Sequence, residues 1–357
     1  MNSLYGIILP SLKIGGGNRV LLKFAELAVR DKKEVKLFHL NREGSKFTNH
    51  IPICVSQYVF NESVLAVLLA SLTISLKIRF NKSVSTVLVS DPILSIFSFI
   101  YSNKKIIRYV QSNDILLFDE NFKANNVFKL VYKFFFKLSQ SYKYHQVIFN
   151  SKYSLRSYNK SLFKLNRYKN DNVVNPSVFS LAYKASYKKP SLSNPNICIV
   201  TNLHSRKGLN EFLYILNNSK LRNINYYLIS QDDVQVPFKN VSVVKPRSDL
   251  EYVGILNKCH IILSTSTFEG FGLPLIEGMA LALVPVSIYN KGLEEYYNGS
   301  NIIFFKDVHS YDYQISKIMR NSNYYKKHSR SAANSVSSFT EDFFYNSIIQ
   351  KINTYEK

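Results

Sequence analysis

The feature that most constrains the fold of this chain is an alternation of short apolar runs with longer amphipathic segments. Such an alternation is typical of a parallel β-sheet that carries helices on both faces. In the first half, one amphipathic segment predicts a helix at Asn18–Arg30. The apolar runs predict strands at Tyr5–Pro10, Glu34–Leu40, Val84–Val89, Lys105–Val110 and Gln146–Asn150. The predicted fold class is therefore α/β.

The same alternation starts again near Asn196, after a stretch at residues 175–196 that is rich in proline, serine and lysine. Composition of this kind suits a linker, and 357 residues suit two domains. The second half predicts a helix at Leu209–Asn217 and strands at Ile197–Val200, Asn225–Ile229, Val241–Val244 and Ile261–Ser264. We therefore predict two Rossmann-like lobes, residues 1–176 and 177–338. A third segment, residues 339–357, is expected to form a C-terminal helix that packs back on the first lobe.

The net charge of +22 is unevenly distributed along the chain. Residues 1–180 contain 26 Lys and Arg against 10 Asp and Glu, whereas residues 181–357 contain 20 against 14. A field of this sign attracts nucleic acid, an anionic membrane surface or phosphate-bearing substrates. A role in nucleic-acid binding is disfavoured because no recognised binding motif accompanies the basic residues. The three cysteines match neither a metal-ligand spacing nor a disulfide framework, which favours a reducing cytosol.

Two segments bear on contact with a membrane. Val64–Ile78 is the most apolar helical stretch, but it is shorter than the roughly 20 residues that span a bilayer, and we expect a buried core helix. In the segment Lys129–Leu138, lysines recur every four residues among phenylalanines. This pattern suits a helix lying on an anionic bilayer, and equally a helix with its aromatic side in the core. The excess charge of the first lobe favours the membrane slightly.

The chemistry is expected in the segment Ser264–Ala280. A predicted strand runs into a loop with Gly270 and Gly272, and Pro274 then marks the start of a helix. Unpaired amides at a helix N-terminus form a site for anions, and glycines let the backbone approach a ligand. We place Glu277 in the first turn, where its carboxylate would reach the hydroxyls of such a ligand. This combination outlines a site for a sugar nucleotide.

A second glycine-rich turn, Gly15–Gly17, follows the first predicted strand. As a dinucleotide-binding fingerprint it lacks the third glycine, because Val20 stands there, and the second strand ends at Asn41 without an acidic residue for ribose. An NAD-dependent enzyme is therefore disfavoured. A plain turn between a strand and a helix remains an alternative.

The string Glu-Gly-Phe-Gly-Leu-Pro-x-x-Glu from Glu269 to Glu277, followed by Gly-Met-Ala, resembles the family 4 (group 1) retaining glycosyltransferases of the GT-B fold. Their hallmark is two glutamates separated by seven residues. The resemblance covers most of the chain and is weaker outside this segment, where it rests on Gly15–Arg19, Asn150–Ser154, Val173–Pro176 and the Lys207-Gly208 pair. It implies two Rossmann-like lobes whose parallel sheets face each other across a cleft, with the donor bound mainly by the second lobe and the acceptor by the first.

The resemblance also implies roles for individual residues. Glu269 is expected near the transferred sugar, Glu277 on the ribose hydroxyls and Lys207 on the diphosphate. Gly16 and Gly17 are expected to face the donor phosphates. The sugar and diphosphate would be lined by the amides of Gly270, Phe271, Gly272 and Leu273.

The sequence departs from the family pattern at two places. Thr201-Asn202 stands where the family often has Gly-Arg with the arginine on the diphosphate, and Asn202 and Arg206 are both candidate donor-binding residues. Arg206 is the candidate substitute for that arginine, although a neighbour at another place is not equivalent to it. Gln111 stands where many members have a histidine near the sugar and the acceptor, and it is a candidate catalytic residue together with Glu269 and Lys207. The Val-Gln pair at this point is similar to that of a subgroup that includes rhamnosyltransferases of surface glycans.

The absence of an Asp-x-Asp motif or a P-loop means that we expect no metal and no other cofactor. The resulting expectation is a cytoplasmic enzyme on the inner face of the plasma membrane. It would transfer a sugar, with retention, from a nucleoside diphosphate to a lipid-linked surface polysaccharide of O-antigen or capsule type. Two alternatives remain: another GT-B enzyme, such as a sugar phosphorylase or a nucleotide-sugar epimerase, and a non-enzymatic basic protein that binds membranes.

Overall fold

The computed structural model divides the chain into two units. Unit 1 contains Met1–Pro176 and Asp342–Lys357, and unit 2 contains Ser177–Glu341. The structure describes residues 4–10, 16–41, 54–59, 64–112, 142, 144–161, 168–178 and 192–354. Most of the linker stretch and the whole of Lys129–Leu138 lie outside these ranges, so the two interpretations of that lysine- and phenylalanine-rich segment stay open.

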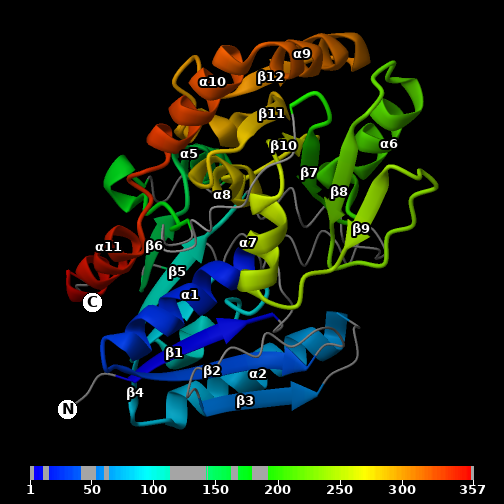
Figure 1. Cartoon of the computed structure of the whole chain (residues 1–357). Helices are drawn as coiled ribbons and strands as arrows, with labels where there is room; N and C mark the ends of the chain where they lie inside the picture. The colour runs from blue at the N-terminus through cyan, green and yellow to red at the C-terminus, as the bar shows by residue number, and fades with distance from the viewer. Residues whose placement is uncertain are drawn as a thin grey trace. The chain divides into compact units, whose positions relative to one another are not determined.

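The described part of unit 1 forms a six-stranded parallel sheet in the order β3-β2-β1-β4-β5-β6 (Figure 1). Its strands are β1 (Leu4–Leu9), β2 (Glu34–Asn41), β3 (Cys54–Val59), β4 (Val84–Val89), β5 (Lys105–Val110) and β6 (His145–Phe149). Its helices are α1 (Gly16–Arg30), α2 (Val64–Phe80), η1 (Ser98–Tyr101), α5 (Lys152–Ser161), η2 (Asn170–Asn172) and α11 (Glu341–Asn353). The strand predictions hold to within one or two residues, and β3 is an additional strand.

The described part of unit 2 repeats this architecture with the order β12-β11-β10-β7-β8-β9. Its strands are β7 (Asn196–Val200), β8 (Asn225–Ile229), β9 (Val241–Val244), β10 (Ile261–Ser264), β11 (Val284–Ile288) and β12 (Ile303–Phe305). Its helices are η4 (Ser205–Lys207), α6 (Leu209–Asn218), α7 (Asp249–Asn257), α8 (Leu273–Ala280), η5 (Lys291–Glu295), α9 (Val308–Arg320) and α10 (Ser322–Ser335). Numbered within each unit, both sheets have the order 3-2-1-4-5-6 of doubly wound nucleotide-binding folds. The predicted α/β class with two parallel sheets is confirmed.

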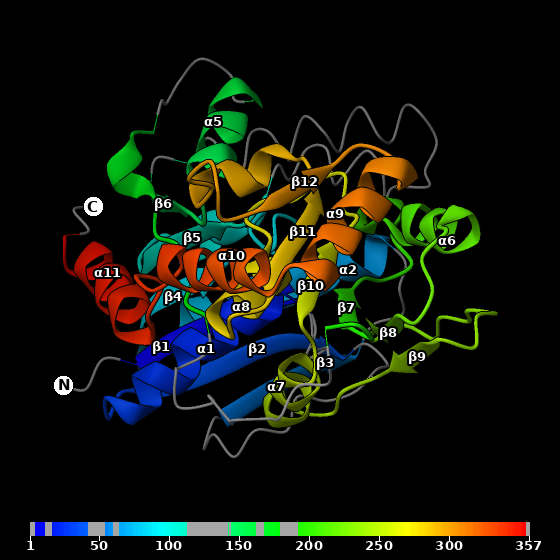
Figure 2. The same cartoon turned by 45° about the horizontal axis from the view of Figure 1, so that its top comes forward.

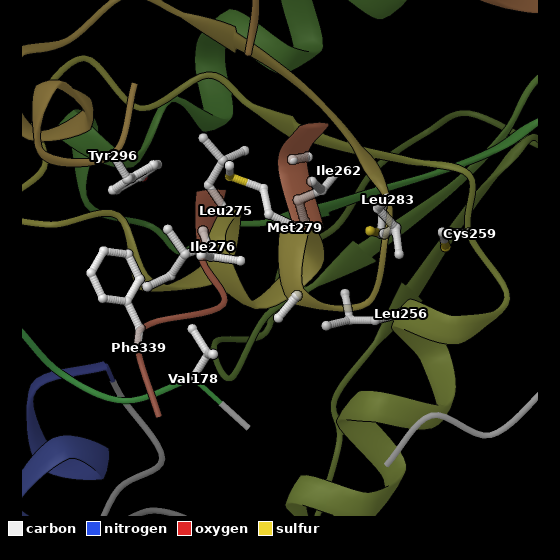
Figure 3. Packing of buried hydrophobic residues seen from close by; sticks show 14 of the residues in the cluster. Val178, Leu256, Cys259, Ile262, Leu275, Ile276, Met279, Leu283, Tyr296 and Phe339 are labelled. Atoms are coloured by element: carbon white, nitrogen blue, oxygen red, sulfur yellow. The ribbon is translucent and has the colours of Figure 1, made fainter. Parts of the chain in front are cut away.

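The sheet of unit 2 is buried on both faces because its strands are apolar at consecutive positions. In β10, Ile261 and Leu263 pack on one side, and Ile262 packs on the other with α8. Figure 3 shows Leu275, Ile276 and Met279 of α8 gathered with Ile262 in this second cluster. Helix α10 contacts both β11 and α8, as Figure 2 also shows. These contacts hold the N-terminus of α8 beside the end of β10.

Helix α2 departs from the expectation of a buried core helix. Ala70, Ile74 and Ile78 are buried in the cluster that covers one face of the unit 1 sheet. Leu69 and Leu76, on the opposite side of the helix, are 50% and 41% exposed. The segment is apolar all round, so its periodicity could not indicate which side faces solvent. No helix in the described part of the chain is long and apolar enough to cross a membrane.

Helix α11 belongs to unit 1, although all of unit 2 precedes it in the chain. The buried ring of Phe344 packs edge-to-face on Tyr109 of β5, with centroids 6.3 Å apart. The hydroxyl of Tyr345 donates a hydrogen bond to Asp31 at 2.9 Å, and its ring contacts Phe24 of α1. The polypeptide therefore passes from unit 1 to unit 2 and back again.

Candidate functional site

The strand order of unit 2 fixes where a ligand is expected. β7 and β10 are neighbours, and the chain winds outward from them in opposite directions. In open α/β sheets, ligands bind outside the carboxyl ends of the two strands at which the winding direction changes. The loop after β7 leads to Lys207 at the end of η4, and the loop after β10 leads to Glu269. Two residues that are 62 positions apart in sequence thus reach the same edge of the sheet.

Lys207 and Glu269 form an ion pair at this edge. The Lys207 Nζ lies 2.7 Å from Oε1 and 2.9 Å from Oε2 of Glu269, so it donates to both carboxylate oxygens. The lysine and glutamate side chains are 23% and 12% exposed. The pair is therefore shielded from bulk water but open on one side, and each charge balances the other when no anionic ligand is bound.

The loops that carry this pair are joined by short-range contacts. The Thr201 hydroxyl donates to the Lys207 carbonyl at 2.8 Å, and the Thr265 hydroxyl donates to the Gly208 carbonyl at 2.7 Å. Gly208 has a φ of 72°, and a Cβ there would lie 2.0 Å from the Thr265 carbonyl oxygen. Only glycine fits at this point, where the two loops touch. The backbone therefore fixes the separation of Lys207 and Glu269.

Helix α8 begins directly after the loop that holds Glu269. Gly272 caps the helix with a φ of 76°, which is a left-handed conformation suited to glycine, and Pro274 lies in the first turn. The first amides of a helix have no carbonyl partner within it, and the helix dipole adds positive potential there. Phe271 anchors the loop, because its buried ring packs against Tyr296 and Phe339. The predicted amide-lined segment Gly270–Leu273 is thus held at a helix N-terminus.

Glu277 is the fifth residue of α8 and therefore lies in the second turn. The sequence-based prediction that it lies in the first turn is wrong. The helix starts at Leu273, which pushes Glu277 beyond the first four positions. Its side chain is buried, and its carboxylate accepts a hydrogen bond from the Tyr252 hydroxyl at 2.8 Å. Tyr252 comes from α7, and no motif near it in the sequence pointed to this contact.

Gly292 and Tyr296 are further residues of this site that sequence reasoning missed. A Cβ on Gly292 would lie 2.2 Å from the Glu269 carbonyl oxygen. The segment after β11 therefore packs directly against the backbone of Glu269, the candidate catalytic residue. The Tyr296 hydroxyl is buried and lies 2.8 Å from the position of a Cβ on Gly272. Burial, and next the negative charge of Glu269, raise the pKa of Tyr296 well above its ordinary value. Tyr296 therefore stays a neutral hydroxyl group beside the loop.

Asn202 and Arg206 lie on the same loop as Lys207. The Asn202 side chain accepts a hydrogen bond from the His204 amide at 3.1 Å, which shapes the start of the loop. The Arg206 carbonyl accepts from the Thr267 amide at 3.1 Å and so connects this loop to the one after β10. The structure gives both residues a local role in the loops, and their predicted contact with a diphosphate stays a prediction.

The other candidate residues, Gly16, Gly17 and Gln111, belong to unit 1. Gly16 and Gly17 begin α1, while Gly15 lies outside the described residues. The Gln111 amide donates to the Gly17 carbonyl at 2.8 Å, and the Gln111 carbonyl accepts from Asn150 at 2.7 Å. The structure thus brings Gly17 and Gln111 together within unit 1, at the carboxyl end of its own sheet. In the described ranges, no group of three or more His, Cys, Asp or Glu residues is placed to hold a metal ion.

The comparisons with known proteins agree with this geometry. Residues 237–335 match the model of the family "glycosyl transferases group 1", and this range contains both Glu269 and Glu277. No curated protein matches the chain significantly. Similar solved structures include a sucrose-phosphate synthase from Thermosynechococcus elongatus, which is 13% identical with a TM-score of 0.75 and covers 98% of each chain.

Two further structures are similar over nearly their whole length. HepE from Anabaena, solved in complex with UDP and glucose, is 13% identical, with a TM-score of 0.74 over 98% of this chain and 99% of its own. WaaG, a glycosyltransferase involved in lipopolysaccharide biosynthesis, is 13% identical, with a TM-score of 0.69 over 97% and 98%. At such identities, the likeness shows the fold, which is GT-B. Together with the family match, it confirms the resemblance to the group 1 glycosyltransferases.

Proposed function

We propose that the chain is a retaining, metal-independent glycosyltransferase. It moves a sugar from a nucleoside diphosphate to a growing lipid-linked surface polysaccharide. The observation that carries the proposal is the Lys207–Glu269 pair, held at the edge of the sheet beside the N-terminus of α8. A cation, a carboxylate and helix amides at one point are the groups that a diphosphate and a sugar require.

The proposed donor is a nucleoside diphosphate sugar. Lys207 would exchange part of its contact with Glu269 for the diphosphate, and the amides of Gly270–Leu273 would face the same group. Glu277, held by Tyr252, would accept hydrogen bonds from the ribose hydroxyls. Support comes from HepE, whose structures contain UDP and glucose or UDP-glucose.

The proposed reaction breaks the bond between the anomeric carbon and the phosphate oxygen. An acceptor hydroxyl forms the new bond to that carbon on the same face, and its proton passes to the departing phosphate oxygen. Negative charge grows on the diphosphate during departure, so preorganised groups such as Lys207 and the α8 amides would stabilise the transition state. Glu269 would hold the transferred sugar through its hydroxyl groups. No covalent intermediate on the protein is needed.

The proposed acceptor is a lipid-linked saccharide, with the protein peripheral on the cytoplasmic side of an anionic membrane. The excess of basic residues in residues 1–180 supports a polyanionic surface as a partner. WaaG, which shares the fold, is involved in lipopolysaccharide biosynthesis. The product would be a surface polysaccharide of O-antigen or capsule type.

Nucleotide binding tests the donor site. In a thermal-shift panel of UDP, GDP, dTDP and their sugar conjugates, we expect one nucleotide to raise the melting temperature by a few degrees. This follows because a ligand at 100 times its dissociation constant adds about 2.7 kcal/mol. Glu277→Gln keeps the side-chain volume and should abolish most of the shift. Asp233→Asn, whose side chain is 97% exposed, is the matched control and should behave like the wild type.

The three alternative functions, a non-enzymatic protein, a sugar phosphorylase and a nucleotide-sugar epimerase, predict different results. If no nucleotide stabilises the protein at millimolar concentration, the donor assignment is wrong and the non-enzymatic alternative is favoured. A sugar phosphorylase would release sugar phosphate only with added phosphate, and an epimerase would change the free nucleotide sugar without an acceptor. NMR of the new glycosidic bond shows whether the transferred sugar keeps its anomeric configuration. Activity that is unchanged by EDTA would support a reaction without a metal.

A further inference from the structure

Helix α2 presents an apolar surface that its packing in unit 1 does not use. Three large apolar side chains on it are exposed: Leu69 at 50%, Leu76 at 41% and Phe80 at 74%. They are separated by seven and four residues, a spacing that places them along one side of a helix. Ala70, Ile74 and Ile78, on the other side, are buried. The exposed apolar residues therefore lie in a stripe along one side of the helix.

The short helix η1 extends this stripe with Phe99. The two elements contact each other, and the Arg79 guanidinium donates to the Ile100 carbonyl at 2.6 Å. Phe99 is 49% exposed and packs edge-to-face on Tyr142. This hydrogen bond and the contact between the two elements place the exposed residues Phe80 and Phe99 on neighbouring segments of unit 1. We call this surface, made of Leu69, Leu76, Phe80 and Phe99, the α2–η1 face.

Basic side chains border the α2–η1 face on both sides. Lys77 and Arg79 are both exposed. Because each helical residue turns by about 100°, Lys77, which follows Leu76, lies on one side of the stripe, and Arg79, which precedes Phe80, lies on the other. Lys82 is exposed just beyond the end of α2. Between residues 64 and 112 there are six Lys and Arg but a single acid, Asp91, whose carboxylate accepts two backbone N–H groups at 2.8 and 2.9 Å. Lys104 and Arg108 are buried, so the positive charge around the face comes from the exposed Lys77, Arg79 and Lys82.

We propose that the α2–η1 face is the surface by which the protein rests on an anionic phospholipid bilayer. Apolar side chains would enter the boundary between headgroups and acyl chains, and the flanking lysines and arginine would meet the phosphates. A second copy of the chain is a poor occupant, because its basic residues would repel those around the stripe. The inference deepens, and rests on, the peripheral location in the proposed function, and it assigns that location to particular residues.

The test is flotation of the full chain with vesicles of phosphatidylglycerol and phosphatidylcholine in equal parts, and with phosphatidylcholine alone. We expect binding to the anionic vesicles, weakened by high salt. The double variant Leu76→Ser/Phe80→Ser should reduce the partition coefficient at least about tenfold, because two large side chains lose their burial in the interface. Lys77→Gln/Lys82→Gln should remove most of the preference for anionic lipid.

Two controls separate a loss of binding from other effects. Leu250→Ser removes an equally large side chain that is 67% exposed on α7 and should bind vesicles like the wild type. Each variant should keep the wild-type melting temperature and nucleotide shift, which shows that it is folded and that the donor site is intact. A nucleotide shift without vesicle binding would sink this inference alone, whereas vesicle binding without any nucleotide shift would sink the proposed enzyme and leave the surface standing.

Three results would overturn the proposal. In the first, the wild type fails to float with anionic vesicles, and in the second, the Leu76→Ser/Phe80→Ser variant floats as well as the wild type. In the third case, the wild type is a dimer in solution that the double variant converts to monomers, and the face is then a contact between copies.

Discussion

At the residue scale, the contact between Lys207 and Glu269 both orients the lysine and balances its charge. Each side chain is held by the other at 2.7–2.9 Å before any donor arrives. A preorganised cation costs little reorganisation when charge develops on a leaving group. The pair therefore keeps the lysine aimed at the edge of the sheet and prevents an unpaired charge in a half-buried site.

Replacing Lys207 tests this role directly. We expect Lys207→Met to lower kcat/KM about 100-fold or more, the size of effect seen when a preorganised donor is removed from an active site. Lys245→Met is the matched control, because Lys245 pairs with Asp233 on the surface and should leave kcat/KM unchanged. Steady-state rates for both variants decide the point, and a Lys207→Met enzyme of nearly normal rate would contradict the assignment.

A second residue, His145 of β6, makes the stability of unit 1 depend on pH. Its Nε2 lies 2.6 Å from the Ser98 hydroxyl, and the side chain is buried. Burial, and next the positive charge of Arg108, lower the pKa of His145 to about 3. The folded protein therefore holds this imidazole neutral, while an unfolded chain protonates it near pH 6.5.

The sign of the pH effect follows from proton binding. Between pH 6.5 and 3 the unfolded state binds the extra proton, so the free energy of unfolding falls as the pH is lowered. His145 causes no loss in the free energy of unfolding above about pH 6.5, and it lowers this free energy by about 2 kcal/mol at pH 5. Urea unfolding at pH 7 and pH 5 measures the loss, and His145→Gln should reduce it. An equal pH dependence in the variant would show that other groups cause it.

At the element scale, the loop after β11 acts as a support for the loop after β10. Gly292→Ala would bring a Cβ within 2.2 Å of the Glu269 carbonyl oxygen. Because backbone must move to relieve this contact, we expect a loss of about 1–3 kcal/mol in stability and a displaced Glu269. Donor affinity and kcat/KM should therefore both fall.

Gly254→Ala is the control for that substitution. Gly254 lies inside α7, and a Cβ there meets nothing within 4 Å. Alanine in a helix interior should stabilise the protein by about 0.5–1 kcal/mol and leave the rate unchanged. Melting temperatures and rates of the two variants, measured side by side, separate contact with Glu269 from a general response to alanine. If Gly292→Ala behaves like Gly254→Ala, the support role is wrong.

The elements also show how far the sequence could be interpreted. Strands β7 and β10 were predictable because Ile197–Val200 and Ile261–Leu263 are uninterrupted apolar runs. Three strands were not predicted: the pair Ser56-Gln57 interrupts the apolar residues of β3, Pro285 interrupts those of β11, and β12 has only three residues. The contact of Lys207 with Glu269 follows from the strand order, which periodicity does not reveal. Tyr252, Gly292 and Tyr296 reach the site only through tertiary packing, so no local pattern marked them.

At the scale of the whole molecule, α11 gives a matched pair of neighbouring residues. Phe344 is fully buried against unit 1, and Phe343 is 54% exposed. Phe344→Ala should cost about 3–5 kcal/mol, because it leaves a cavity in a packed core. Phe343→Ala should change stability by no more than about 0.5 kcal/mol. Denaturant unfolding of both variants tests whether α11 is an integral part of unit 1, and equal effects would show that it is not.

The passage of the chain out of unit 1 and back has a consequence for folding during synthesis on the ribosome. All strands of unit 2 are synthesised before Asp342, so unit 1 lacks α11 while the sheet of unit 2 is being made. The places on unit 1 that Phe344, Ile348 and Ile352 later fill are open to solvent during this interval. Chaperones are therefore expected to protect the incomplete unit 1 during this interval, until α11 follows unit 2 and completes the packing of unit 1.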